Sequence, residues 1–274
     1  MEVTAGGRDI MMEYVTSAQL EYVKKQRNRR RWVGRARILV LLLFLGAWEF
    51  FARVGVINDF IFSSPSRMFL CMSEMVSDGS VFYHTGITIL ETMISFLLVI
   101  VIGIGGAVIL WSNKMISDIL DPYLVILNSL PKSALAPILI VWLGANVRTI
   151  IVAAISVAVF GSILTLHNGF SNVDPDQIKL IVSLGGSRKD IMTKVLLPGS
   201  IPLIVSNMKV NIGLCLVGVI IGEFLVARAG LGYLIIYGSQ TFQLSLVMTS
   251  ITILCMLSGM MYMGIGMIEK RIKQ

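Results

Sequence analysis

The chain alternates long apolar stretches with shorter polar ones. An α-helix needs about 20 consecutive apolar residues to cross the hydrocarbon core of a bilayer. Stretches of roughly this kind lie at about 38–56, 86–111, 122–143, 149–167, 200–225 and 246–268. The pattern predicts an all-α membrane protein in which six transmembrane helices pack as one domain over residues 38–274.

Composition agrees with this pattern, since hydrophobic residues make up 55% of the chain and charged residues 14%. Soluble domains carry about 25% charged residues, so a soluble globular protein is excluded. The first apolar stretch is not expected to be a cleaved signal peptide, because it lacks a small-residue cleavage site. Near its end, Glu49 and Arg53 are spaced for an ion pair one helical turn apart.

The positive charges predict the orientation, because cytoplasmic loops of membrane proteins are enriched in Lys and Arg. Of the 23 Lys and Arg residues, seventeen lie in residues 1–37, the 112–121 loop, the 168–199 loop and the C-terminal tail, whereas four lie in the loops of the other side. We therefore expect both termini in the cytoplasm. Residues 1–37 are interpreted as a basic cytoplasmic segment that also contacts anionic membrane lipid. The net charge of +7 follows from this topology, and no nucleic-acid partner is expected.

The second cytoplasmic loop carries two helix signals in succession. Asp174 can cap a helix whose first turn holds Pro175, and Gln177 completes a pair like a capping box. This helix is expected to run to Leu184, where Gly185 supplies the left-handed residue that ends it.

A second helix is predicted directly afterwards. Ser187 can cap it and Asp190 can close a second capping box, and the helix is expected to run to Leu197 before Pro198 stops it. Two interpretations fit this short, rigid helix pair. It can rest on lipid headgroups as a surface helix, or it can insert into a partner protein as a docking element.

The loop resembles the cytoplasmic "EAA" loop of binding-protein-dependent ABC importer permeases. That motif reads EAA, three residues, Gly, nine residues, then Ile-x-Leu-Pro. Gly185 stands at the glycine of the motif, Val195 at its isoleucine, and Leu197 and Pro198 at its final pair. The motif's glutamate is replaced by Lys179, which reverses the charge expected to face the ATPase; we expect the cognate ATPase to compensate.

The resemblance covers roughly residues 60 to 270 and points to the nitrate, sulfonate and taurine branch of these permeases. It is carried by FSSPSRM (62–68), LPKSALAPILIVWLG (130–144), GFSNVDPDQI (169–178) and GEFLVARAGLGYLI (222–235). It implies the type I (MetI-like) permease fold in the plasma membrane of a prokaryote. The implied ATPase-coupling residues are Asp174, Pro175, Lys179, Gly185, Gly186, Ser187, Arg188, Asp190, Val195, Leu197 and Pro198.

The resemblance also implies partners: two ABC ATPase subunits, an extracytoplasmic solute-binding protein, and a second copy of the chain in a homodimer. A phosphate-binding loop requires a Gly-Lys pair, and the sequence contains none. We therefore expect ATP and Mg²⁺ to bind the partner ATPase, and no cofactor to bind this chain.

Ionisable residues inside apolar stretches cost about 2.5–3.5 kcal/mol at the bilayer centre, so they are candidates for function. Lys132 lies between two prolines that should bend its helix. It either attracts an anionic solute in the pathway, pairs with Glu91 or Glu223, or reaches to an interface. Glu223 precedes a Gly-Leu-Gly-Tyr stretch that by resemblance forms an outer loop near the gate. The pathway candidates are Pro131, Lys132, Pro137 and Glu223.

An enzyme is not expected, because the two histidines, His84 and His167, are predicted near opposite faces of the membrane. For the same reason no metal site is predicted. The sequence is best interpreted as the permease subunit of an ATP-driven importer for a small solute, by its branch an organic anion or nitrate. The alternative is an ATP-independent secondary transporter or channel, although no inverted repeat is evident. A co-purifying ATPase would discriminate between the two.

Overall fold

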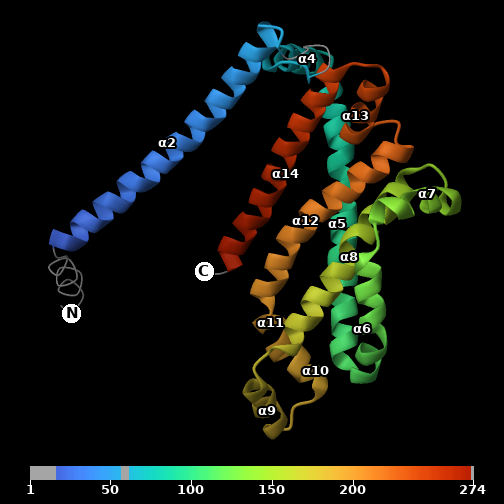
Figure 1. Ribbon diagram of the computed structural model, residues 1–274. Coiled ribbons are helices and arrows are strands. Elements are labelled where there is room, and N and C mark those ends of the chain that lie inside the picture. Colours follow the sequence, from blue (N-terminus) through green and yellow to red (C-terminus); the bar gives the residue numbers. More distant parts are fainter. Residues whose placement is uncertain (1–16, 57–61, 273–274) are drawn as a thin grey trace. The chain divides into compact units, whose positions relative to one another are not determined.

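The computed structural model describes residues 17–56 and 62–272, which form helices and loops with no strand among them. They fall into two compact units that divide between Ser66 and Arg67. In the first unit, α2 (Ser17–Arg53) is one continuous helix that joins the end of the basic segment to most of the first apolar stretch (Figure 1). Glu49 pairs with Arg53 at 2.7 Å, which confirms the predicted ion pair.

The second unit contains the other long helices. Its first helix, α4 (Pro65–Ser77), begins two residues before the boundary between the units. The elements that follow are α5 (Ser80–Ser112), α6 (Lys114–Ser129), α7 (Lys132–Leu143), α8 (Val147–Ser171), α9 (Pro175–Ser183), α10 (Arg188–Ile191), the π-helix η1 (Met192–Leu196), α11 (Leu197–Gly199), α12 (Ile201–Val226), α13 (Leu231–Gln240) and α14 (Leu244–Ile272).

Helix α8 forms the centre of this unit, because it packs extensively against both α5 and α12. Small residues allow the close approach. A Cβ added at Gly218 of α12 would lie 2.5 Å from the Cα of Ala154, and one added at Gly222 would lie 2.9 Å from the Cα of Ile150. In lipid the hydrophobic effect contributes little to helix association, so such close backbone contact is a main source of the packing energy between helices.

The predicted span 122–143 is two helices and not one. Helices α6 and α7 meet at a bend of 96°. Leu130 there adopts an extended conformation, with φ −63° and ψ 140°. The cause is Pro131, since proline disfavours the helical conformation of the residue before it and has no N–H to donate. Pro137 lies inside α7 without breaking it, so only one of the two predicted proline bends is sharp.

Among the described residues, four helices are long and apolar enough to cross a membrane, namely α5, α8, α12 and α14, and the bent pair α6 and α7 can supply a fifth. The described part of the chain is therefore an all-α membrane protein. The six-span count and the cytoplasmic position of the termini stay predictions. Within the second unit, the α9–α11 loop lies at one end and α13 at the other (Figure 1).

Candidate functional site

The loop that is predicted to be cytoplasmic begins with α9, which is capped from its own sequence. The side chain of Asp174 accepts a hydrogen bond from the backbone N–H of Asp176 at 2.9 Å, and Pro175 occupies the first helical position. The predicted cap at Asp174 is thus confirmed. The predicted second bond of this cap, from the Gln177 side chain, is not among the hydrogen bonds of the described residues. Lys179 pairs with Asp176 at 2.9 Å on the exposed surface of α9, so part of its charge is already offset within the helix.

The turn after α9 is a Schellman motif built on two glycines. Gly185 has φ +78°, as predicted. The N–H of Gly185 donates to the carbonyl of Val182 at 3.0 Å, and that of Gly186 donates to the carbonyl of Ile181 at 2.9 Å. These bonds satisfy carbonyls that the end of a helix otherwise leaves unpaired. A Cβ at Gly186 would lie 2.9 Å from the Ile181 carbonyl oxygen, so both positions favour glycine.

The second capping box is confirmed. The Ser187 hydroxyl accepts from the N–H of Asp190 at 3.3 Å, and the Asp190 carboxylate accepts from the N–H of Ser187 at 2.9 Å. Lys194 adds an ion pair to the same carboxylate at 2.9 Å. The Lys194 ammonium, followed by the Ser187 bonds, holds the pKa of Asp190 well below its usual range. The box therefore stays charged and intact at physiological pH.

The prediction that Pro198 stops this helix is wrong, because the helical backbone continues to Gly199. A proline ring clashes with the carbonyl four residues earlier in a regular α-helix. Here the π-helix η1 widens the turn, and the N–H of Leu197 donates to the carbonyl of Met192, five residues back. The extra residue in the turn lets the chain pass through Pro198 without breaking.

The second half of the loop is anchored to the membrane helices. Leu196 is fully buried in a cluster with Ala107 of α5 and with Leu166 and Phe170 of α8. Arg188 donates to the backbone carbonyl of Trp111 at 3.3 Å, and its guanidinium lies 5.6 Å from the centre of the Trp111 ring. By contrast, each of the nine residues of α9, all of them described, remains at least partly exposed. The loop thus has one fixed half and one projecting half.

The projecting half also presents apolar side chains to its surroundings. Leu180, Val182 and Leu184 are 58%, 58% and 76% exposed. Apolar groups this exposed, next to the charges of Lys179 and Asp176, give a mixed surface of the kind that protein interfaces use.

Lys132 lies at the first position of α7, directly after the bend. Its ammonium donates to the backbone carbonyl of Leu127 in α6 and lies 5.3 Å from the centre of the Phe160 ring. Of the ion pairs between described residues, none includes Lys132. The proposed pairing with Glu91 or Glu223 is therefore not what the structure has. The lysine instead satisfies a carbonyl near the C-terminal end of α6, and a pathway role stays a prediction.

A cluster at the other end of the unit holds Glu223, which is 1% exposed. Thr88 of α5 donates its hydroxyl hydrogen to the Glu223 carboxylate at 2.7 Å, and the N–H of Gly232 donates to it at 2.6 Å. The N–H of Leu231 donates to the Thr88 hydroxyl at 2.9 Å, and that of Gly230 donates to Nδ1 of His84 at 3.0 Å. Three consecutive N–H groups of the Gly-Leu-Gly stretch are thus held by α5 and α12.

The hydrogen-bonded contact of Gly230, Leu231 and Gly232 with α5 and α12 is called the Gly-Leu-Gly clamp below, and it requires glycine for steric reasons. Gly230 has φ +117°, in the region that favours glycine. A Cβ at Gly232 would lie 2.8 Å from the Cβ of Glu223. The loop can therefore lie against the buried carboxylate only because both side chains are absent.

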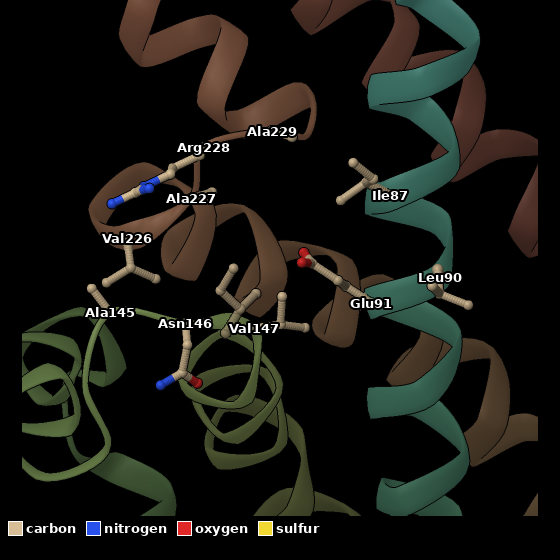
Figure 2. Close-up of a pocket in the computed structure, with 11 residues that line it drawn as sticks. Ile87, Leu90, Glu91, Ala145, Asn146, Val147, Val226, Ala227, Arg228 and Ala229 are labelled. Atoms are coloured by element: carbon tan, nitrogen blue, oxygen red, sulfur yellow. The ribbon is translucent and has the colours of Figure 1, made fainter.

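Glu91 neighbours this cluster and borders a cavity of about 390 Å³. It is 3% exposed, and its carboxyl group interacts with that of Glu223, so two buried carboxyl groups lie side by side here. Figure 2 shows its side chain pointing from α5 into the cavity. The remaining wall is mostly apolar and comes from α5, the α7–α8 loop, the start of α8, the end of α12 and the loop after it. The lining residues are Ile87, Leu90, Ala145, Asn146, Val147, Ile150, Val226, Ala227, Arg228 and Ala229.

Residues 99–274 match the family model described as binding-protein-dependent transport system inner membrane component. The chain belongs to this family. The permease is therefore a multi-pass inner-membrane protein of a binding-protein-dependent transport system, and it carries the predicted type I ABC importer permease fold.

Full-length relatives agree with the family. A probable ABC transporter permease protein of Haemophilus influenzae is 27% identical, with 86% of the permease and 98% of that protein covered. A permease protein named for aliphatic sulfonate transport in Bacillus subtilis is 24% identical, with 92% and 91% covered. The taurine transport system permease protein of Escherichia coli is 20% identical, with 92% and 95% covered.

A solved structure gives the fold directly. An inward-facing form of the MetNI methionine ABC transporter matches the permease with a TM-score of 0.62 and 20% sequence identity, covering 68% of the permease and 93% of that chain. This match supports the arrangement of α5, α8, α12 and α14 as that of the type I permeases.

Glu223 and the loop caps could be identified from the sequence, but the residues that hold them in place could not. Thr88 and His84 carry no local motif, and the permease brings them to the Gly-Leu-Gly stretch from more than 130 residues away. Trp111 is likewise an ordinary apolar residue in the sequence. The pathway candidates do not form one group in the permease, because Lys132 lies in the bend between α6 and α7, whereas Glu223 lies in the Gly-Leu-Gly clamp.

Proposed function

We propose that the permease forms a homodimeric pathway driven by two ABC ATPase subunits and supplied by an extracytoplasmic solute-binding protein. In this proposal ATP and Mg²⁺ bind the ATPases, and the permease contributes alternating access without chemistry. The names of the relatives favour a small organic anion or nitrate as the solute, since several are named for sulfonates, taurine or nitrate.

The main support for this proposal is the rigid, anchored structure of the α9–α11 loop. A loop that only rests on lipid does not require two caps, a Schellman turn and a buried anchor on two membrane helices. A loop that transmits force does, because a flexible connection would absorb the movement of the ATPase. The exposed face of α9 is then the ATPase contact, and the Arg188–Trp111 contact passes the displacement to α5.

Co-purification tests the proposal. The permease is expressed with a tag alongside the ATPase encoded with it, and the complex is isolated in detergent and reconstituted. We expect the ATPase to co-purify and its ATP hydrolysis to rise when the solute-loaded binding protein is added. A permease that moves solute in proteoliposomes without any ATPase would instead establish the secondary transporter or channel.

Variants on α9 locate the contact. Leu180→Asp and Leu184→Asp place a charge on the exposed apolar surface and should release the ATPase. Thr193→Asp, on an exposed position of the anchored half, serves as the control and should leave it bound. Equal retention of the ATPase by all three would refute the assignment of α9 as the contact.

A further inference from the structure

Two carboxyl groups lie side by side in a buried site next to the Gly-Leu-Gly clamp. Glu91 of α5 and Glu223 of α12 are both almost fully buried, and their side chains are hydrogen-bonded to each other. Of the ion pairs between described residues, none includes either group. Two ionised carboxylates repel each other strongly in such a site, and a hydrogen bond between two carboxyl groups requires a proton on one of them. The pair therefore holds one proton.

The hydrogen bonds around Glu223 identify the group that carries this proton. Its carboxyl accepts from the Thr88 hydroxyl at 2.7 Å and from the N–H of Gly232 at 2.6 Å. The N–H of Tyr233 contributes a further hydrogen bond. Donors that converge on a carboxyl group in this way favour its ionised form. Among the described residues, the hydrogen bond of the Glu91 carboxyl is the one to Glu223. Glu223 is therefore the carboxylate, and Glu91 is the neutral acid that donates to it.

The other charged and titratable groups around the pair leave this assignment in place. Arg228 lines the same cavity, but it is exposed, and Figure 2 shows its guanidinium directed away from the Glu91 carboxyl. His84 of α5 accepts from the N–H of Gly230 with its Nδ1, and Tyr233 of α13 stacks on the His84 ring at 6.1 Å. The part of the cavity wall that comes from the α7–α8 loop and the start of α8 consists of residues without a titratable side chain, namely Ala145, Asn146, Val147 and Ile150.

We propose that Glu91 is a positioning residue that carries a proton and donates a hydrogen bond to the Glu223 carboxylate, so that the Gly-Leu-Gly clamp is closed only while Glu91 is protonated. Loss of this proton to a water molecule in the cavity leaves two carboxylates, whose repulsion displaces Glu223. The N–H of Gly232 and the Thr88 hydroxyl then lose their acceptor. Since the Thr88 hydroxyl in turn accepts from the N–H of Leu231, two of the three clamp bonds depend on the proton.

This role goes beyond the proposed import function, because it is the same for any solute and requires no ATPase. The full-length permease in lipid nanodiscs can therefore be used to test it.

Infrared spectroscopy shows where the proton lies, because the carbonyl stretch of a neutral carboxylic acid is distinct from the bands of a carboxylate. The spectrum is measured at pH 7, and ¹³C-labelled glutamate identifies the bands that come from glutamate. We expect a neutral-acid band in the wild type and its loss in Glu91→Gln. Glu74→Gln makes the same change at an exposed carboxyl of α4 and should keep the band. Absence of the band from the wild type, or its persistence in Glu91→Gln, would overturn the proposal.

Amide hydrogen exchange shows whether the proton holds the clamp. Protection of the Leu231 and Gly232 N–H groups, corrected for intrinsic rates, is compared at pH 7 and pH 9. We expect the protection to fall about tenfold or more in the wild type and in Glu74→Gln, since a hydrogen bond to a charged group is lost. His84 does not contribute to the difference, because a neutral imidazole keeps its acceptor nitrogen over this range.

Glu91→Gln separates the proton from a purely structural role of the side chain. Its amide still donates to Glu223 but cannot ionise, so its protection should be the same at both pH values. An equal fall in Glu91→Gln and in the wild type, or no fall in the wild type, would refute the role of the proton.

The outcome is separable from that of the proposed function, because neither measurement includes an ATPase or a solute-binding protein. Failure of the ATPase to co-purify would refute the import complex and leave the role of Glu91 unchanged. A pH profile that is the same with and without the Glu91 carboxyl would refute only the role of Glu91.

Discussion

Substitution of Gly185 tests whether the turn between α9 and α10 transmits movement. Its φ is +78° and an added Cβ would meet no atom within 4 Å, so any cost comes from the backbone alone. The left-handed conformation costs an L-residue roughly 1–2 kcal/mol, and asparagine tolerates it better than most. Strained positions of this kind reach about 3 kcal/mol, which we expect for a β-branched residue. The predicted order of impairment is Gly185→Asn, then Gly185→Ala, then Gly185→Val.

These costs are large compared with the stability of a short turn. Each 1.4 kcal/mol changes the ratio of the intact to the broken turn about tenfold, so Gly185→Val should lower that ratio by roughly one to two orders of magnitude. The two Schellman bonds, from Gly185 and Gly186, would be lost together. Helix α9 would then remain attached to the permease but would no longer be held at a fixed angle to α10.

The assay compares solute-stimulated ATP hydrolysis per assembled complex, with amide hydrogen exchange over α9 as the structural measurement. Stimulation should fall along the predicted series while the amount of complex in the membrane stays unchanged. Gly199→Ala is the matched control, because an added Cβ there also meets no atom within 4 Å and no positive φ is involved. Wild-type stimulation in Gly185→Val, or equal impairment in Gly199→Ala, would show that the left-handed turn is not what couples the loop.

Three further predictions concern charged residues. Lys179→Glu removes the ion pair with Asp176 and presents two carboxylates to the ATPase, so we expect less ATPase to co-purify; more would argue that the family's glutamate suits this partner. Lys132→Met should lower uptake per assembled complex and Lys132→Arg should retain part of it; a fall in yield with unchanged uptake per complex would assign Lys132 to holding the Leu127 carbonyl at the bend. Because the pKa of Asp190 is depressed, its contribution to loop order is present above the usual aspartate pKa of about 3.9 and is lost only as the pH falls below it. Hydrogen exchange over α10 in the wild type, corrected for intrinsic rates, should therefore show the same protection at pH 5 as at pH 7, and an earlier loss would contradict this.

The local features of the loop could be predicted from the sequence because each is decided within a few residues. A cap depends on a side chain and an N–H two or three positions away, as in Asp174 and Ser187. The left-handed residue at Gly185 follows from the absence of a side chain. Such choices involve no distant partner, so a single sequence contains the information they need.

The features that the sequence did not yield depend on packing between distant segments. The π-helix η1 is not encoded by a local motif, and it places Leu196 in a core shared with α5 and α8. The sharp bend at Pro131 could be anticipated, but its size of 96° could not. The hydroxyl that donates to Glu223 could not be predicted for the same reason, since Thr88 is 135 positions away.

Helix α5 gives these separate features a common mechanical meaning. Its 33 residues correspond to about 50 Å at 1.5 Å per residue. Near one end it holds the Gly-Leu-Gly stretch through His84 and Thr88, and Glu91 lies there at the cavity; near the other end it receives Arg188 through Trp111. Because α8 packs extensively against α5, a bend in α5 would disrupt the core. Movement at the Trp111 end of α5 is therefore more easily accommodated as a displacement of the whole helix. In the proposed complex, the hydrogen bonds that close the Gly-Leu-Gly clamp are therefore the contacts that such a displacement would strain first, which links the state of the ATPase to the solute side through one element.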